Sequence, residues 1–217
     1  MAGIVLYSYW RSTTSVRVRA ALNLKGVDYD TRAIDLVAGA QKDPDYAKIN
    51  PGQGVPSLVL EDGTVLTQSM AILDYLEVAY PTPPLLPKDP VQRALVLAAA
   101  HTIALDIHPV NNLRVLAVLK ERYGADAAQS RTWMNHWMQE GFTALEAMLP
   151  EDMPSFAFGA APDLADLCIT GQCCNARRWG LDMTPFPKIR RIDAACRAVP
   201  EIHAAHPEQQ PDAQPQI

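Results

Sequence analysis

A proline-dense segment divides this chain into two parts with different sequence patterns. Prolines stand at positions 81, 83, 84, 87 and 90, and no helix can run through them because proline lacks the backbone donor. Before this segment strand-like and helical runs alternate, whereas strand patterns almost vanish after it. We therefore expect a domain at 1–81, a stiff linker at 82–90, a helical domain at 91–206 and a disordered tail at 207–217.

The first part has the pattern of a small mixed sheet with helices. Ile4–Tyr9 is apolar and rich in β-forming residues, and a helical run, Ser15–Lys25, follows it and ends at Gly26. The other elements expected here are strands at Val27–Leu36, Val55–Leu60 and Val65–Leu66, and a helix at Met70–Tyr80. This order differs from a dinucleotide-binding fold, and the G-x-G-x-x-G motif is absent from the sequence.

The second part is expected to be all helical. Helical patterns cover Val91–Ile107, Val110–Tyr123, Arg131–Leu149, a run with Asp163 as its N-cap, and Pro187–Ala198. Within Arg131–Leu149 we expect one apolar stripe to face the core, made of Trp133, Trp137, Ala144, Leu145 and Met148.

The charge and the cysteines limit the possible partners. The net charge is −5 and no long basic run occurs, which argues against binding of nucleic acid or of an anionic membrane. The apolar runs are short of a membrane span, and no signal peptide is visible. The four cysteines form no C-x-x-C pair and the histidines lack zinc-ligand spacing, so we expect free thiols, no metal site and a cytoplasmic location.

Four consecutive hydroxyl residues, Ser12 to Ser15, stand where the first strand ends and the first helix begins. Backbone N–H groups point outward at a helix N-terminus with partial positive charge, and a Ser or Thr there can hold an anion. Taken alone, the same hydroxyls fit a plain helix cap equally well. Of the arginines close by, Arg11 is a candidate for reading further negative charge, whereas Arg17 and Arg19 are expected to be structural partners of acids.

Several motifs together resemble one enzyme family. Tyr7–Arg19 is similar to the zeta-class signature Ser-Ser-Cys-x-Trp-Arg-Val-Arg, and further zeta-like text occurs at Ala47–Pro51, Val55–Pro56, Gln68–Ser69 and Leu181–Pro187. Asp106–Arg114 resembles the bacterial maleylpyruvate isomerases in particular. From about residue 4 to 206 the chain thus resembles the zeta-class glutathione transferases, known as maleylacetoacetate isomerases. The resemblance implies an α/β thioredoxin-like N-terminal domain followed by an all-α C-terminal domain.

Two positions depart from the animal zeta enzymes. Thr14 stands where they carry cysteine, and Val16 stands where they carry tryptophan. Thr14 also occurs in the maleylpyruvate branch, so it shifts the expectation toward that branch and removes the cysteine as a participant.

The resemblance implies that glutathione is the cofactor and lies against the N-terminal domain. Pro56 is expected to follow a cis bond, so that the backbone of Val55 pairs with the cysteinyl part of glutathione. Gln68 and Ser69, at a helix N-terminus, would take the γ-glutamyl carboxylate. The weaker candidates are Gln41 and Gln53, and the second domain would complete the pocket with His108 and Asn112.

Ser12 is the first choice for contacting the glutathione thiol, with Thr14 second and Ser15 in support. Lowering a thiol pKa by ~2 units requires ~2.7 kcal/mol. One hydrogen bond to a charged group supplies about 1.5–3 kcal/mol, and a helix terminus adds about 0.3–2 kcal/mol. These groups are therefore sufficient without a metal or a histidine base, although Tyr7 and Tyr9 remain possible donors.

The resemblance also implies a dicarboxylate substrate. Arg11, Arg114 and Arg178 match arginines of the maleylpyruvate branch and are expected to grip its two carboxylates. The expected activity is cis–trans isomerisation of maleylacetoacetate or maleylpyruvate to the fumaryl isomer in aromatic catabolism, by a homodimer. The alternatives are a general glutathione transferase or dehalogenase, for which the three arginines would have no use, and a non-catalytic interaction module of the same fold.

Overall fold

The computed structural model describes residues 3–152 and 155–214, and the chain divides into two compact units. The first unit combines Met1–Leu85 with Arg197–Ile217, and the second is Leu86–Cys196. The boundary between the two units lies at 85/86, inside the proline-dense segment. The C-terminal end differs from expectation, because the residues after Cys196 belong with the N-terminal part.

A four-stranded mixed sheet in the order β2-β1-β3-β4 forms the centre of the first unit. Its strands are β1 (Val5–Ser8), β2 (Asp30–Ala33), β3 (Ser57–Val59) and β4 (Val65–Thr67). β1 runs parallel to β2 and antiparallel to β3, and β3 runs antiparallel to β4. The Asp62–Gly63 turn joins β3 to β4 as expected, because Gly63 takes the positive φ that the turn requires.

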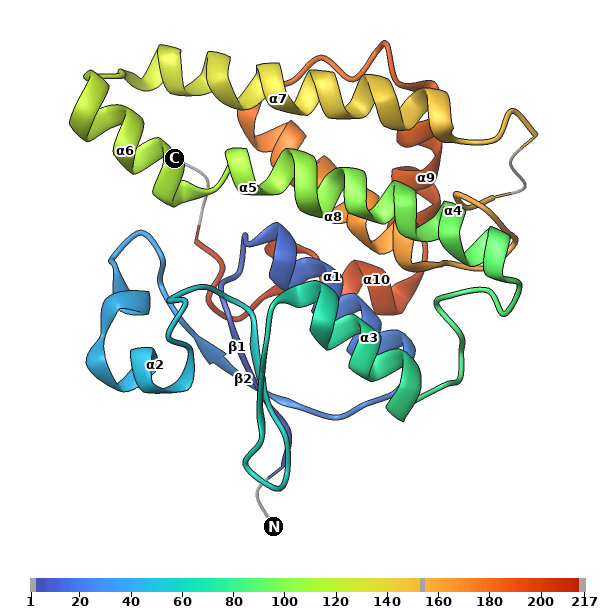
Figure 1. Ribbon diagram of the computed structural model, residues 1–217, viewed down its shortest axis with the longest axis horizontal. Helices are drawn as coiled ribbons and strands as arrows, with labels where there is room; N and C mark the ends of the chain where they lie inside the picture. Colours follow the sequence, from blue (N-terminus) through green and yellow to red (C-terminus); the bar gives the residue numbers. More distant parts are fainter. Residues whose placement is uncertain (1–2, 153–154, 215–217) are drawn as a thin grey trace. The chain divides into compact units, whose positions relative to one another are not determined.

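The helices of this unit are α1 (Thr13–Leu24), α2 (Pro44–Ile49), α3 (Ser69–Ala79), α10 (Pro200–Ala204) and the short 3-10 turns η1 (Ala40–Lys42) and η3 (Pro207–Gln209). Figure 1 shows α1 beside both α3 and α10, and α1 packs against each of them. Every residue of α1 from Thr13 to Leu22 is buried, so this helix is central to the unit rather than a surface helix.

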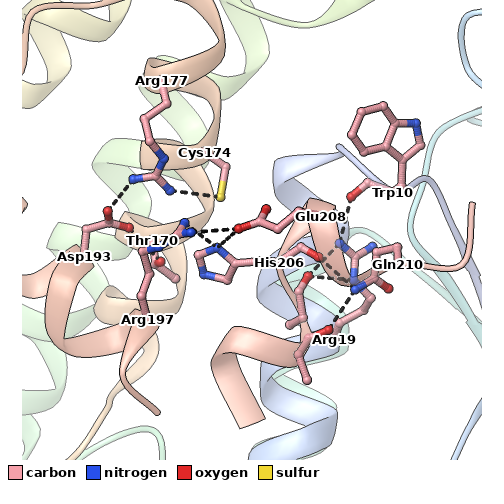
Figure 2. Close-up of polar contacts among 12 residues, drawn as sticks. Trp10, Arg19, Thr170, Cys174, Arg177, Asp193, Arg197, His206, Glu208 and Gln210 are labelled. Carbon is pink, nitrogen blue, oxygen red and sulfur yellow. Dashed lines mark hydrogen bonds and ion pairs between the residues drawn. The ribbon is translucent and has the colours of Figure 1, made fainter. Parts of the chain in front are cut away.

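The second unit is helical throughout its described part. It contains α4 (Pro90–His101), a π-helical turn η2 (Thr102–Ile107), α5 (His108–Val110), α6 (Leu113–Tyr123), α7 (Ala127–Met148), α8 (Leu164–Trp179) and α9 (Pro187–Arg197). α4 packs on α8, and α7 packs on both η2 and α8 (Figure 1). Thr170 and Arg177 of α8 both bond Asp193 of α9 (Figure 2). The N-cap expected at Asp163 is present and forms a capping box with Asp166.

The run Pro90–Tyr123 is helical over nearly its whole length and has a mean hydropathy of 1.2 in its most apolar stretch. By length and composition alone it could cross a membrane, contrary to the expectation that every apolar run is too short. Within the second unit it is interrupted at Asn111 and Asn112, and its buried residues pack against the neighbouring helices.

The apolar stripe expected on α7 is wrong in most of its members. The buried residues of this helix are Met134, Met138, Phe142 and Leu145, whereas Trp133 and Trp137 are only half-buried. Ala144 and Met148 are exposed. The buried face of α7 is thus shifted by about one residue from the expected stripe. The Trp133 indole N–H donates to the Val110 carbonyl at 2.8 Å. An indole with a polar tip favours such an intermediate position over full burial.

The disordered tail expected at 207–217 is also wrong for the residues that the structure describes. Pro207–Gln209 form η3, and Pro207 is buried. Asp212 accepts a hydrogen bond from the backbone N–H of Trp10 at 3.1 Å. Residues 215–217 lie outside the described part of the chain.

Gly141 lets α7 approach η2 closely. A Cβ built at this position would overlap Cγ1 and Cδ1 of Ile107, whose side chain is buried. We expect Gly141→Ala to lower the free energy of unfolding by about 1–3 kcal/mol through overpacking, despite a helix-propensity gain of about 1 kcal/mol. Urea unfolding measures this change. An unchanged or higher free energy of unfolding would mean that Ile107 moves aside without cost.

Two carboxyls are buried at the start of α8. Burial raises the pKa of Asp163 to about 6, although the hydrogen bonds that this carboxylate accepts from backbone N–H groups lower the pKa in part. Burial and the charge of Asp163 raise the pKa of Asp166 well above its ordinary value. Since the folded chain then binds more protons than the unfolded chain above the ordinary pKa, stability falls as pH rises from roughly 4 toward 6.

We therefore expect Asp163→Asn, which keeps the capping oxygen, to gain stability relative to the wild type as pH rises. The gain should be about 1–3 kcal/mol between pH 4 and 7, measured by urea unfolding across this range. The matched control is Asp126→Asn at the exposed N-cap of α7, which should show no such gain. A pH-independent difference between Asp163→Asn and the wild type would contradict the assignment.

Candidate active site

The first candidate residues lie on a tight turn that connects β1 to α1. The backbone N–H of Ser12 donates to the carbonyl of Tyr9 at 3.0 Å and closes the turn. Ser12 has an extended backbone and is the N-cap of α1, and its Oγ accepts from the N–H of Ser15 at 3.3 Å. The expected cap is therefore present, and the Ser12 hydroxyl lies at the N-terminal end of α1.

A chain of hydroxyl groups leads from Ser12 to Val55. Thr14 Oγ1 donates to the Val55 carbonyl at 2.9 Å, and it lies 2.7 Å from Ser12 Oγ. Since the threonine hydroxyl has one hydrogen and gives it to Val55, Thr14 accepts from Ser12. The structure thus brings the two hydroxyls and Val55 together, and it gives them different roles. Thr14 is buried and donates to Val55, whereas Ser12 is half-buried and can turn its hydroxyl toward an anion.

Ser15 lies deeper than the other two. Its side chain is fully buried, and within the described residues its Oγ has no hydrogen-bond partner. Its backbone N–H already bonds Ser12. Ser15 therefore supports the position of Ser12 through its main chain. The tyrosines fit less well as donors, because Tyr9 is buried and Tyr7 packs against Tyr46 with ring centroids 5.5 Å apart.

The Val55–Pro56 peptide bond is cis, as the resemblance implied. The loop in front of it is held by two residues that were not among the candidates. The Tyr46 hydroxyl and Asn50 Nδ2 both donate to the Gly54 carbonyl, the latter at 2.9 Å, and Asn50 also bonds Ser57 at 3.0 Å. Burial raises the pKa of Tyr46, although hydrogen bonds with Ser57 and Asn50 oppose the rise, so the phenol stays a donor. Asn50 belongs to the zeta-like string Ala47–Pro51, which was the available signal.

Two candidate glutamines have unusual backbone conformations. Gln68 has a φ of 67° at the N-cap of α3, and Gln53 has a φ of 50°. Non-glycine residues rarely adopt positive φ, and such strain concentrates at ligand sites. Both side chains are exposed, whereas Ser69 is buried at the first position of α3. Gln41 instead turns toward its own loop, where its Nε2 donates to the Leu36 carbonyl at 3.4 Å.

Arg11 lies on the same turn as Ser12. Its guanidinium carbon is 5.5 Å from the ring centroid of Tyr9 and 5.4 Å from that of Trp10, within reach of cation–π attraction. Its Nε is buried, and among the described residues it has no hydrogen-bond partner. A cation held by two rings beside the hydroxyls gives this turn a second group that can bind an anion.

The remaining candidates lie in the second unit. His108 begins α5, and Asn112 is the N-cap of α6, where its Oδ1 accepts from the N–H of Arg114 at 3.1 Å. Arg114 itself is exposed. Arg178, near the end of α8, is half-buried with its guanidinium carbon 5.2 Å from the ring centroid of Trp179. Asn112 therefore has a helix-capping role as well as its candidate role, and it lies next to Arg114.

The first unit thus brings neutral hydroxyls, a helix N-terminus and one arginine together at one turn. Within the described residues no group of His, Cys, Asp or Glu could hold a metal ion. None of the four cysteines forms a disulfide, and none of them lies in the turn. This donor set suits a thiolate or carboxylate, which hydroxyls and backbone N–H groups stabilise by hydrogen bonds.

Comparison with known proteins gives a consistent answer. The family model "Glutathione S-transferase, N-terminal domain" matches residues 2–78. The maleylacetoacetate isomerase of Dictyostelium discoideum is 42% identical over 214 residues, covering 98% of this chain and 97% of that protein. The maleylpyruvate isomerase of a Ralstonia species is 44% identical over 211 residues, covering 96% of this chain and 99% of that protein.

Solved structures agree with these relatives. The holo structure of a bacterial maleylpyruvate isomerase, described as a zeta-class glutathione S-transferase, has a TM-score of 0.94 at 43% identity. It covers 97% of this chain and 100% of that chain. This chain belongs to the zeta class of the glutathione transferases. The expected fold of this zeta-class chain, a thioredoxin-like unit and a helical unit, is confirmed.

A further solved structure contains the ligand glutathione. The maleylacetoacetate isomerase of Anaeromyxobacter dehalogenans, with glutathione bound in its active site, has a TM-score of 0.88 at 43% identity. The match covers 98% of this chain and 98% of that chain.

Proposed function

We propose that this zeta-class chain is a glutathione-dependent isomerase that converts maleylacetoacetate or maleylpyruvate from the cis to the trans (fumaryl) isomer. The observation that supports this most strongly is the hydroxyl chain from Ser12 through Thr14 to Val55 at the N-terminus of α1. It occurs in a chain whose full-length relatives carry these isomerase names.

The residues of the first unit fit glutathione. Val55 would pair with its cysteinyl part, and Ser69 with Gln68 at the N-terminus of α3 would take its γ-glutamyl carboxylate, with Gln53 and Gln41 at the edge. His108 and Asn112, in the helical unit, are the further candidates for contacting glutathione. When bound, glutathione supplies a thiolate that adds reversibly to the conjugated double bond, which becomes single and can rotate.

The residues of this chain have two tasks in that chemistry. Without glutathione Ser12 gives its one hydrogen to Thr14; on binding it would turn this hydrogen to the thiolate, while the backbone N–H of Ser15 still holds its oxygen. Arg11, Arg114 and Arg178 bind the two carboxylates of the substrate and stabilise the negative charge that moves toward its ketone oxygen. No general acid is required, because the net protonation of the substrate does not change.

The test is a direct assay of both purified cis diacids with the purified chain, with and without glutathione, followed by proton NMR of the vinyl signals. We expect conversion to the trans isomer only when glutathione is present. Glutathione binding and conjugation of a neutral electrophile, without isomerisation of either diacid, would indicate a general transferase or dehalogenase instead. Failure to bind glutathione at all would indicate a non-catalytic interaction module.

The setting of this activity is part of the same proposal. A cytoplasmic homodimer acting in aromatic catabolism, without a nucleic-acid or membrane partner, fits the acidic charge, the free cysteines and the family. Sedimentation of the purified chain measures its oligomeric state.

A further inference from the structure

The C-terminal segment, defined here as residues 205–212, is fixed to the first unit by buried contacts. Ala205 and His206 are fully buried. Gln210 Nε2 donates to the carbonyls of Ala204 and His206 at 2.8 and 2.9 Å, and Arg197 donates to Glu208 at 2.8 Å (Figure 2). The segment therefore has a defined path despite its polar composition.

One buried arginine connects this segment to the turn that carries Ser12. Arg19 is 1% exposed, and its Nε and Nη2 donate to the Ala205 carbonyl at 3.0 and 2.8 Å. The same guanidinium donates to Ser8 Oγ at 2.7 Å and to the Tyr9 carbonyl at 3.4 Å. It also donates to the Trp10 carbonyl at 2.9 Å (Figure 2). One hydroxyl and three main-chain carbonyls thus accept hydrogen bonds from this guanidinium.

Asp212 holds the other side of the turn. Its Oδ2 accepts from the backbone N–H of Trp10 at 3.1 Å, while the carbonyl of Trp10 accepts from Arg19. The peptide groups on both sides of Trp10 are therefore fixed by side chains from outside the turn. One of the two bonds has an ionised acceptor and the other an ionised donor, which makes both stronger than bonds between neutral groups.

The position of Ser12 depends on this arrangement through a short path. Tyr9 and Trp10 are the first two residues of the turn, and Ser12 is its fourth, closed by the bond from its N–H to the Tyr9 carbonyl. Rotation of the Trp10 peptide would move the Ser12 backbone and hence the hydroxyl that faces an anion. A shift of about 1 Å in such a group is enough to weaken catalysis strongly.

We propose that Asp212 is a positioning residue for the turn that carries Ser12, and that the C-terminal segment thereby completes the thiol-binding site. The inference rests on the proposed function only in taking Ser12 as the residue that contacts the thiol. Arg19 supplies the fixed connection between the segment and the turn, and Asp212 sets the orientation of the Trp10 peptide.

The test compares Asp212→Ala with the control Glu208→Ala. Both variants lose a carboxylate of the same segment, but the Glu208 carboxylate bonds Arg197 and not the turn. In Asp212→Ala we expect the amide hydrogen of Trp10 to exchange about tenfold faster, measured by NMR, because a charge-assisted bond is lost. We also expect the ultraviolet absorbance of enzyme-bound glutathione thiolate to titrate at higher pH. Glu208→Ala should leave both readouts at the wild-type value. Asp212→Asn, which keeps an oxygen acceptor without the charge, should give values between those of the wild type and Asp212→Ala.

A pair of truncations keeps the test independent of side-chain replacement. A chain that ends at Pro211 should behave like Asp212→Ala, and a chain that ends at Gln214 should behave like the wild type. Unchanged Trp10 exchange in Asp212→Ala, or equal effects of Asp212→Ala and Glu208→Ala, would overturn the inference. If the wild type isomerises neither diacid while the Trp10 and thiolate readouts respond to Asp212→Ala, the proposed function fails and the positioning role stands.

Discussion

Replacement of Ser12 by alanine is expected to lower turnover of the diacid about 100-fold while glutathione affinity changes less than threefold. The reason is the size of a hydrogen bond to a charged group, about 1.5–3 kcal/mol, which acts on the thiolate and hardly on the rest of the tripeptide. Val55, Gln68 and Ser69 would still hold the peptide portion. Steady-state kinetics and isothermal calorimetry measure the two quantities separately.

Ser12 also caps α1, so the loss of the cap must be separated from the loss of the donor. An N-cap replacement costs about 1 kcal/mol of stability. The matched control is Asp126→Ala at the exposed N-cap of α7, which should cost a similar amount and leave turnover unchanged. Ser12→Thr, which keeps a hydroxyl, should recover much of the activity. Parallel losses of turnover and of glutathione binding in Ser12→Ala would reject the assigned role.

Replacement of Arg178 by alanine is expected to raise KM for the diacid tenfold or more, because an arginine–carboxylate pair contributes about 1.5–3 kcal/mol. Conjugation of a neutral electrophile should be unaffected, since no carboxylate needs to be bound in that reaction. Kinetics with both kinds of substrate on the same preparation give the comparison.

The control for this variant is Arg131→Ala, an exposed arginine at the start of α7 for which no site role is proposed. It should leave KM for the diacid unchanged. If Arg178→Ala weakens the neutral reaction as strongly as the diacid reaction, Arg178 does not select the substrate, and Arg11 with Arg114 would have to do so.

The elements with clear local patterns could be predicted from the sequence. The strand before Ser12, the following helix, the Asp62–Gly63 turn and the Asp163 cap each depend on residues within a few positions of one another. The helix stripe on α7 was wrong because apolar residues occur on adjoining faces of that helix. Tertiary packing decides which face is buried, and it buries Met134, Met138, Phe142 and Leu145. The sequence of the helix alone does not contain this information.

The candidate site divides in the same way. The position of the Ser12 and Thr14 hydroxyls at the N-terminus of α1 could be predicted, because a strand end and a helix start are local patterns. The direction of the hydrogen bonds from Ser12 to Thr14 to Val55 could not be predicted. It depends on the Val55 carbonyl, which lies 41 residues from Thr14 in the sequence. The tail was wrong for a similar reason. Its composition is that of a disordered segment, and it is ordered by a bond between Trp10 and Asp212, 202 residues apart.

The first unit contains both ends of the chain, which has a consequence for biosynthesis. A nascent polypeptide that has left the ribosome only as far as Cys196 carries the whole sheet, yet it lacks Ala205 and Asp212. Domains generally fold as units while translation proceeds. Here the helical insertion can mature first, and the guanidinium of Arg19 meets the Ala205 carbonyl only after residue 205 has been synthesised.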